Sequence, residues 1–211
     1  MRVLQIDASA RRAHSSSRML SAYFIARLRH SLPDLALDYI DTAADCPPPL
    51  NATFIEALYT TAAERSPAMK QALSYSDNLC ARALMADMLV CAMPMYNFCM
   101  PASFKALLDQ LVRVNLTYTL NADGSTSGKL AQHKILFITT RGADLRPGSP
   151  WHNMDALRPA LQAAFAFMGA DDPVFVDVQP LENIDSLAKT QLLAQARHTL
   201  DALASRWLTG I

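Results

Sequence analysis

The chain has 211 residues with 19 basic and 19 acidic side chains, so its formal net charge is zero. This balance argues against a nucleic-acid binder, whose affinity depends on many Lys and Arg contacts with phosphate. Hydrophobic residues make up 51% of the chain, which fits a large globular core rather than disorder. The length favours one domain, and we expect a single domain over residues 1–211.

The cysteines and the first residues indicate the cellular compartment of the protein. The four cysteines show no C-x-x-C spacing, and the apolar surroundings of Cys80 and Cys91 predict buried free thiols rather than ligands or bridges. The start, Met1-Arg2-Val3-Leu4, runs straight into a strand-like segment, so no signal peptide is expected. No apolar run approaches the ~18–20 residues of a membrane span. We therefore expect a cytoplasmic protein with no membrane insertion.

The N-terminal part alternates between strand and helix signals. Val3–Asp7 predicts a first strand, and Ser16–Leu32 predicts a helix with apolar residues at three- and four-residue spacing. Leu35–Ile40 alternates like a second strand. The proline run after Cys46 indicates a long connection through Tyr59. Ser66-Pro67 is typical of a helix start, and that helix should run to about Ala83.

The middle of the chain contains the most apolar segment. Met88–Met93 is a nearly unbroken apolar run, which predicts a central strand buried on both faces of a parallel sheet. A helix is expected from Pro101 to about Asn115. Tyr118–Leu130 is expected to be an irregular excursion that turns at Asn121–Gly124.

The C-terminal part continues the alternation. Lys134–Thr139 and Val174–Val178 predict the fourth and fifth strands. Asp155–Met168 predicts a helix that ends at Gly169, and Asp185–Leu208 predicts a long last helix. Five strands that alternate with five helices imply an α/β fold, with a parallel sheet and right-handed crossovers.

The loop after the first strand is rich in hydroxyl groups. Its candidate ligand-binding residues are Ser9, Arg11, Ser15, Ser16 and Ser17. They precede or open a helix, whose N-terminus carries unpaired N–H groups and partial positive charge that suit a phosphate. The loop contains neither a dinucleotide fingerprint nor an NTPase phosphate loop. The alternative is that one serine only caps the helix and the arginines are solvated.

The loop after the central strand is Pro94-Met95-Tyr96-Asn97-Phe98. Open α/β sheets bind ligands at the carboxyl ends of their strands, and this turn offers apolar faces and an amide to a flat aromatic ligand. The alternative is an ordinary aromatic-rich connection that packs on its own core.

The loop after the fourth strand is Thr140-Arg141-Gly142-Ala143. Gly142 permits a positive φ, which would turn backbone amides toward a ligand. The alternative is a plain strand-ending turn.

The three loops together are more specific than any one of them. In a doubly wound sheet of order 2-1-3-4-5, strands 1, 3 and 4 are neighbours, so their carboxyl-end loops meet at the switch point. A phosphate site, an aromatic and amide wall, and an amide-rich turn match flavin mononucleotide (FMN), with its phosphate at the first helix and its ring at the other two loops.

These residues resemble the FMN-dependent NADH azoreductases, also described as FMN-dependent NADH:quinone oxidoreductases. Four segments carry the resemblance: Ser9-Ala10-Arg11 with Ser15–Arg18, Pro94–Phe98 with Pro101 and Lys105, Thr140-Arg141-Gly142, and Phe167-Met168-Gly169. The resemblance implies a flavodoxin-like fold with helices on both faces of the sheet. It also implies a homodimer with two tightly bound FMN molecules at the interface.

The implied reaction moves two electrons from NADH or NADPH, by way of FMN, to quinones and azo compounds in a ping-pong mechanism. Tyr118 and Phe167 would roof the substrate slot, where a partner subunit can contribute, whereas Phe165 would belong to the core. No catalytic side chain and no metal are expected; four histidines without metal-like spacing read as surface or loop residues: His14, His133, His152 and His198. A flavodoxin-like electron carrier and a flavin-free regulatory protein are the alternatives.

The sequence departs from the family pattern at several positions. Ala143 replaces a second Gly, Asn115 replaces a Gly before Leu116, and Cys99 places a thiol near the expected flavin. The family's aromatic residue before Asp109 is missing. These departures concern acceptor preference and the rim of the site.

Overall fold

A five-stranded parallel sheet forms the centre of the molecule in the computed structural model, which describes residues 1–209. The strands of this sheet are β1 Arg2–Asp7, β2 Ala36–Asp41, β3 Met88–Pro94, β6 Lys134–Thr140 and β7 Val174–Val178. Their order is β2-β1-β3-β6-β7. The expected order 2-1-3-4-5, counted along the chain, is therefore confirmed.

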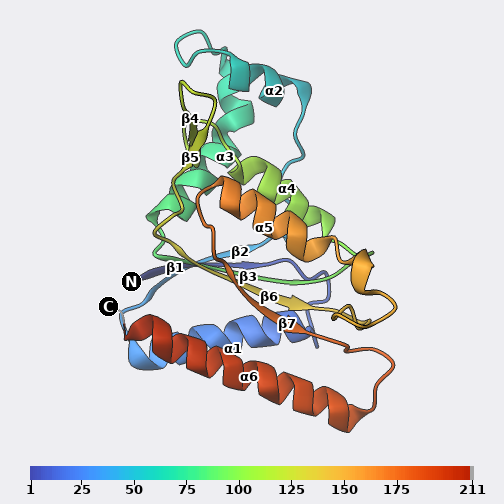
Figure 1. Cartoon of the computed structure of the whole chain (residues 1–211). Helices are drawn as coiled ribbons and strands as arrows, with labels where there is room; N and C mark the ends of the chain where they lie inside the picture. The colour runs from blue at the N-terminus through green and yellow to red at the C-terminus, as the bar shows by residue number, and fades with distance from the viewer. Residues whose placement is uncertain (210–211) are drawn as a thin grey trace.

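Helices cover both faces of the sheet, as Figure 1 shows. On one face, α1 Ser16–Ser31 and α6 Ser186–Leu208 lie side by side. On the other face lie α3 Pro67–Met85, α4 Ala102–Leu111 and α5 Leu157–Phe167. This three-layer arrangement is the flavodoxin-like fold that the resemblance implies.

Strand β3 belongs to both apolar cores. Leu89, Cys91 and Met93 join the core beneath α3, α4 and α5. Met88, Val90 and Ala92 join the core with α1 and α6. Both faces of the strand are therefore shielded from water, which explains why its sequence is a continuous apolar run rather than an alternating one.

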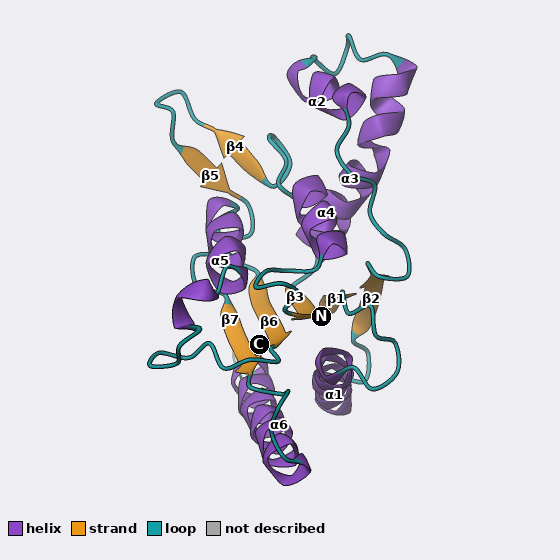
Figure 2. Ribbon diagram, turned by 90° about the vertical axis from the view of Figure 1, so that its right-hand side faces the viewer, coloured by secondary structure: helices purple, strands orange, loops and turns teal. Residues whose placement is uncertain are grey.

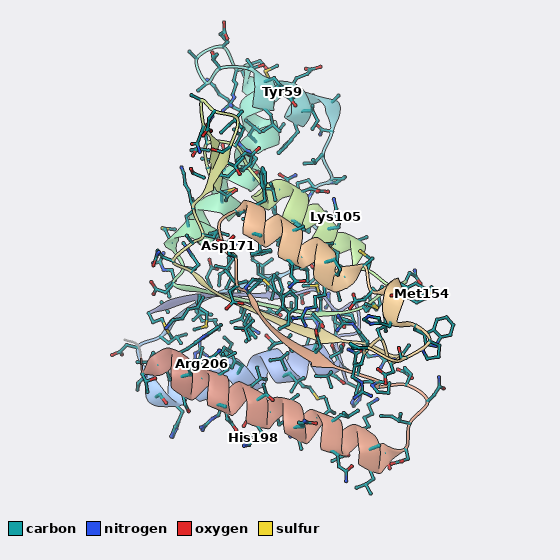
Figure 3. The ribbon with its side chains drawn as sticks, in the orientation of Figure 1. Tyr59, Lys105, Met154, Asp171, His198 and Arg206 are labelled. Atoms are coloured by element: carbon teal, nitrogen blue, oxygen red, sulfur yellow. The ribbon has the colours of Figure 1, made fainter. Side chains whose placement is uncertain are left out.

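The prediction of an unbroken connection through Tyr59 is wrong, because an eight-residue helix, α2 Ala52–Tyr59, forms its second half. The side chain of Asn51 caps this helix by accepting a hydrogen bond from the Phe54 N–H at 2.9 Å. Phe54 and Ala57 pack with Leu73 of α3 in a small separate cluster. Figure 3 shows Tyr59 at the far tip of the molecule, well away from the sheet.

The excursion expected at 118–130 is a regular hairpin. Strands β4 Tyr118–Leu120 and β5 Thr126–Gly128 pair in an antiparallel manner, and Gly124 at the turn has φ 83°. Figure 2 shows the hairpin beside α5, on the same side of the sheet as α2 and α3. A Cβ at Gly128 would lie 2.0 Å from the backbone of Met168, so only Gly allows this contact with the end of α5.

Two helix boundaries differ from the expected ones. Helix α4 ends at Leu111 rather than near Asn115, which has φ 64°. Because Asn tolerates the left-handed region, it can replace the Gly that the family pattern has there. Helix α5 begins at Leu157 because the carboxylate of Asp155 accepts the N–H groups of Leu157 and Arg158. Within residues 1–209, no helix is both long and apolar enough to cross a membrane.

Candidate functional site

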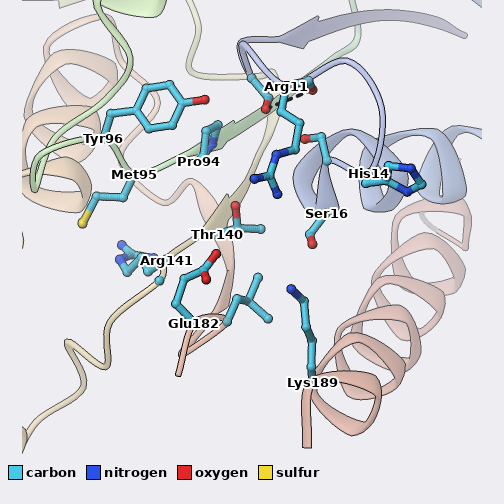
Figure 4. A pocket seen from close by; sticks show the side chains of 14 residues that line it. Arg11, His14, Ser16, Pro94, Met95, Tyr96, Thr140, Arg141, Glu182 and Lys189 are labelled. Atoms are coloured by element: carbon cyan, nitrogen blue, oxygen red, sulfur yellow. Dashed lines mark hydrogen bonds between the residues drawn. The ribbon is translucent and has the colours of Figure 1, made fainter. Parts of the chain in front are cut away.

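A cavity of about 280 Å³ opens at the carboxyl ends of β1, β3 and β6 (Figure 4). The loops after all three strands line it, as the order of the sheet predicts. The lining includes the following residues singled out from the sequence: Ser9, Arg11, Ser15, Ser16, Pro94, Met95, Tyr96, Thr140, Arg141 and Gly142.

At one end of the cavity, α1 presents its N-terminus. Ser15 is the N-cap and its Oγ accepts a hydrogen bond from the Arg18 N–H at 3.5 Å. The N–H groups of Ser16 and Ser17 belong to the first turn, where a helix offers no internal acceptor. Ser16 faces the cavity, whereas Ser17 is fully buried and its Oγ lies 3.3 Å from that of Ser15. The Ser17 hydroxyl therefore contacts the Ser15 hydroxyl inside the protein and does not line the cavity.

Arg18 fixes the path of the loop at this end. Its Nη2 donates to the Ser9 carbonyl at 2.7 Å and to Asp41 Oδ1 at 2.7 Å, while Nη1 donates to Asp41 Oδ2 at 2.8 Å. These hydrogen bonds from Arg18 hold the pKa of Asp41 below its usual value. The strand end of β1 and the start of α1 are thereby tied to β2.

The carboxylate of Asp7 lies beside this network, with its Oδ2 3.8 Å from Arg18 Nη1. Its Oδ2 accepts the Tyr39 hydroxyl at 3.0 Å, and its Oδ1 is buried without a protein partner. Burial raises the pKa of Asp7 despite this hydrogen bond. Burial, followed by the charge of Asp7, raises the pKa of Tyr39 to about 12. A cluster of titratable groups that includes the buried Asp7 therefore stands directly behind the serine-rich loop.

At the other end of the cavity, residues 96–99 form a tight hairpin turn. The Tyr96 N–H donates to the Cys99 carbonyl at 2.9 Å, and the Cys99 N–H donates back to Tyr96 at 3.0 Å. The two central residues, Asn97 and Phe98, have φ 47° and 67°, as a type I′ turn requires. A left-handed Phe costs roughly 1–2 kcal/mol. Such strain is characteristic of functional sites.

Neither central residue of this turn lines the cavity; both side chains are exposed. The cavity is lined instead by Met95 and Tyr96, and the Tyr96 hydroxyl accepts the Ala10 N–H at 3.3 Å. This hydrogen bond links the turn to the serine-rich loop. The amide contact expected from Asn97 stays a prediction.

Arg141 is buried completely beneath the third loop. Its Nη2 donates to Asp155 at 2.9 Å, and its Nη1 donates to Asp177 at 2.9 Å and to Thr139 Oγ1 at 2.6 Å. Arg158 approaches Asp177 from the solvent side at 2.9 Å. The network joins β6, β7 and the start of α5, so the Arg141 side chain fixes the loop.

The positive φ expected at Gly142 is wrong: among residues 1–209, the glycines with positive φ are Gly124, Gly148 and Gly169. A Cβ at Gly142 would instead lie 2.9 Å from Glu182 Cγ. The Gly142 carbonyl accepts the N–H groups of Leu181 and Glu182, both at 3.1 Å. Gly142 therefore makes room for the loop after β7.

Four lining residues were not singled out from the sequence: His14, Leu181, Glu182 and Lys189. Figure 4 shows that Lys189, on α6, and Arg11 extend into the cavity from opposite sides, with Ser16 and Thr140 between them. Glu182 points toward the same space. The predicted topology could have indicated Leu181, Glu182 and Lys189, because the loop after the fifth strand must leave the sheet at the same edge as the other three loops.

The remaining site residues lie elsewhere. Ala143 borders a second cavity beyond Gly142, and its φ is not positive, so a family glycine is not required there. Tyr118 and Phe167 pack edge to face with ring centroids 4.6 Å apart, outside the cavity of their own chain. Phe167 is 41% exposed, whereas Phe165 is buried in the core as predicted.

The cysteines and metal-binding residue types add no further site to the described chain. Cys80 and Cys91 are buried free thiols, as predicted, and burial raises the pKa of Cys80 to about 11. Cys99 is half-buried beside the aromatic turn. Within residues 1–209, no three His, Cys, Asp or Glu side chains gather as a metal site would need.

The donor set of the cavity fits FMN. Serine hydroxyls, a helix N-terminus and two cationic side chains at one end match a phosphate. Pro94, Met95 and Tyr96 at the other end offer apolar contact to a flat ring, with the Thr140 hydroxyl beside them.

Comparisons with known proteins agree with this fold. A family model described as a flavodoxin-like fold matches residues 1–203. An azoreductase from Bacillus anthracis superposes with a TM-score of 0.89 at 19% identity, over 98% of this chain and 99% of that one. An FMN-dependent NADH-azoreductase from the same species, solved in complex with FMN, gives a TM-score of 0.86 at 20% identity, with 98% of each chain covered. At these identities the structures establish the shared fold.

The sequence relatives establish more. The FMN-dependent NADH:quinone oxidoreductase of Nostoc punctiforme is 36% identical over 205 residues, which cover 97% of this chain and 98% of that protein. Fold and sequence thus agree along nearly the whole length, and the chain belongs to the FMN-dependent NADH:quinone oxidoreductase family.

Proposed function

We propose that this protein binds FMN in the cavity at the carboxyl edge of the sheet and uses it to reduce quinones and azo compounds with electrons from NADH or NADPH. The observation that supports this most strongly is the convergence of a helix N-terminus, cationic side chains and an apolar turn on one cavity. The chemistry that a bound FMN supplies is two-electron transfer between reduced nicotinamide and an acceptor.

The chain's own groups bind and orient the ligands. Ser9, Ser15 and Ser16, together with the N–H groups of the first α1 turn, would hold the phosphate, and Arg11 and Lys189 would balance its charge. The backbone at 95–98 and 140–143 would hold the ring, and its N–H groups would stabilise negative charge on the ring's polar edge. No lining side chain is required as a nucleophile. Donor and acceptor would use one slot in turn, which gives ping-pong kinetics.

The test is to purify the protein and examine it in two steps. A yellow protein that releases FMN on denaturation would support the cofactor assignment, whereas a colourless protein that does not take up FMN would overturn it. Steady-state consumption of NADH and NADPH with a panel of quinones and azo compounds then tests the activity. Parallel double-reciprocal lines are expected. An FMN-loaded protein that reduces none of the acceptors would instead favour an electron carrier.

We further propose a homodimer. Tyr118 and Phe167 are paired away from the cavity of their own chain, so they could roof a slot only in a second copy. Ile55 and Tyr59 of α2 are also exposed, at 42% and 88%, and such apolar surface is typical of an interface. Light scattering should give twice the mass of one chain, and Phe167→Ser should weaken association. A monomer at micromolar concentration would contradict the dimer.

A cytoplasmic location is the last part of the proposal. The four cysteines are free, as a reducing compartment would keep them. Cell fractionation tests this location, and recovery from a secreted fraction would contradict it.

A further inference from the structure

A second cavity adjoins the candidate FMN site. It has a volume of about 750 Å³ and lies between the loop after β6 and the loop after β7. Gly142 and Glu182 line both cavities, so a ligand that begins at the ring end of the first can continue into the second. We call this second cavity the donor groove. Its size falls within the range of small-molecule sites, about 300–1,000 Å³.

The loop that forms one wall of the groove is fastened by its own hydrogen bonds. The Leu145 N–H donates to Gln179 Oε1 at 2.8 Å, and the Ser149 hydroxyl donates to the Asp144 carbonyl at 2.7 Å. His152 Nδ1 lies 3.2 Å from the Leu145 carbonyl. The wall is therefore held in place without a ligand, which lowers the entropic cost of binding.

Trp151 is the aromatic residue of this wall. Its side chain is 50% exposed, so part of the indole is accessible to a ligand in the groove. The short 3₁₀ turn His152–Met154 follows it directly, and Figure 3 shows Met154 at the end of the molecule where the strands terminate. An exposed indole face beside a groove is a stacking surface for a nucleobase.

The charges in the groove favour hydroxyl groups over phosphate. Its charged lining residues are Asp144, Arg146 and Glu182. Arg146 is already paired with Asp144 through two short contacts, Nε to Oδ1 at 2.8 Å and Nη2 to Oδ2 at 2.6 Å. Glu182 has no cation within 4 Å among the described residues. The free carboxylate of Glu182 would accept ribose hydroxyls and repel a 2′-phosphate, while Asp144 neutralises Arg146, which would otherwise attract that phosphate.

From these observations we propose that the donor groove binds the adenosine half of the reduced nicotinamide dinucleotide. Adenine stacks on Trp151, and the free carboxylate of Glu182, together with the neutralised Arg146, favours NADH over NADPH. This inference rests on the proposed function, since it assigns the place of that function's electron donor.

The first experiment uses Trp151→Ala, with Met154→Ala as a matched control that removes an exposed apolar side chain outside the groove. Trp151→Ala should raise the KM for NADH about tenfold, the effect of losing a base–aromatic stack. The KM for reduced nicotinamide mononucleotide, which lacks the adenosine half, should not change. Met154→Ala should change neither KM.

A binding measurement complements the kinetics. Calorimetric titration of the FMN-loaded protein with ADP-ribose should show binding that Trp151→Ala abolishes and Trp151→Phe largely retains. Binding of ADP-ribose that is equal in the wild type and Trp151→Ala would overturn the assignment of Trp151.

The second variant, Asp144→Asn, leaves Arg146 without its partner. The ratio of kcat/KM for NADPH to that for NADH should rise about tenfold, since one charge-assisted contact with the 2′-phosphate becomes available. An unchanged ratio would overturn the charge argument.

The outcomes separate the groove from the activity. If the wild type reduces quinones with similar KM values for NADH and the mononucleotide, the groove does not bind the adenosine half, and the proposed function stands. If it reduces them with neither donor, the proposed function fails and the groove with it.

Discussion

The two ends of the cavity are built from different chemical groups. At the end proposed for the phosphate, side-chain hydroxyls surround the start of α1: those of Ser9, Ser15 and Ser16. At the end proposed for the ring, the turns at 95–98 and 140–143 form the wall, and a buried side chain, Arg141, fixes the second of these turns from below.

The difference shows what a substitution can do at each end. A side-chain change at the phosphate end removes a contact with the ligand while the fold survives. A change at the ring end alters the path of the backbone, so it affects stability and binding together. Four predictions test this contrast, from the largest expected effect to the smallest.

Arg141→Met should produce the largest effect. It leaves Asp155 and Asp177 without their buried cation, and breaking such a pair typically costs about 3–5 kcal/mol of unfolding free energy. Urea denaturation measures this loss. Because the loop over Arg141 forms part of the ring end, FMN affinity should fall in the same variant.

Arg158→Met is the control for Arg141→Met. It removes the other cation on Asp177, and the Arg158 side chain is 45% exposed. Exposed ion pairs contribute about 1 kcal/mol or less, so the loss should be small. Equal losses in the two variants would show that burial of Arg141 is not the source of its effect.

The sequence contained enough information for the sheet and most helices. The apolar run at 88–93 marks a doubly buried strand, and strand and helix signals alternate along the chain, which predicts a parallel sheet. The order 2-1-3-4-5 is that of a doubly wound sheet, and the structure confirms it. Helix α2 was not predicted because it has only eight residues, two of them buried. It packs in the small cluster with Leu73 of α3 rather than on the sheet. Periodicity is weak evidence over so few turns.

The site was predictable where side-chain identity is itself the binding chemistry, as at the serine-rich loop. It was not predictable where register decides. Ser16 and Ser17 are equivalent in sequence, yet one faces the cavity and the other is fully buried. Glu182 and Lys189 reach the site from a loop and a helix that no local motif distinguishes.

Ser15→Ala tests the phosphate end. It removes an N-cap and a proposed phosphate ligand, whereas Ser66→Ala removes the N-cap of α3, away from the cavity. Each variant should lose about 1 kcal/mol of stability. In Ser15→Ala alone, the Kd for FMN should rise at least about tenfold, since a hydrogen bond to a charged group is lost.

Riboflavin, which lacks the phosphate, supplies the second arm of that experiment. Its affinity should be the same in wild type and Ser15→Ala. If FMN and riboflavin weaken equally, Ser15 acts on the fold and not on the phosphate.

Acid should loosen the phosphate end through Asp41. Because its hydrogen bonds with Arg18 lower its pKa in the folded state, its stabilising contribution is complete above the unfolded value of 3.8 and is lost as pH falls through the folded value. Asp7 has the opposite sign: burial raises its pKa, so its contribution is fullest at low pH and declines as pH rises.

The measurement is the free energy of unfolding from neutral pH to about pH 2, which extends well below the ordinary Asp value. Asp41→Asn should be less stable than wild type by about 1 kcal/mol at neutral pH, with the gap closing in acid. Asp34→Asn, at an exposed turn, is the control and should follow the wild-type profile. A gap that persists in acid would show that Asp41 acts through packing rather than charge.

The smallest effect concerns the strained turn at the ring end. Asn97 has φ 47°, so Asn97→Ala should lose about 1 kcal/mol of stability and some FMN affinity, whereas Asn97→Gly keeps the turn and should bind FMN almost as the wild type does. The comparison is decisive because both variants lack the amide. If Asn97→Gly also loses FMN, the amide itself contacts the ring, and side chains supply binding atoms at both ends. If Asn97→Gly retains FMN, the ring end depends on backbone shape.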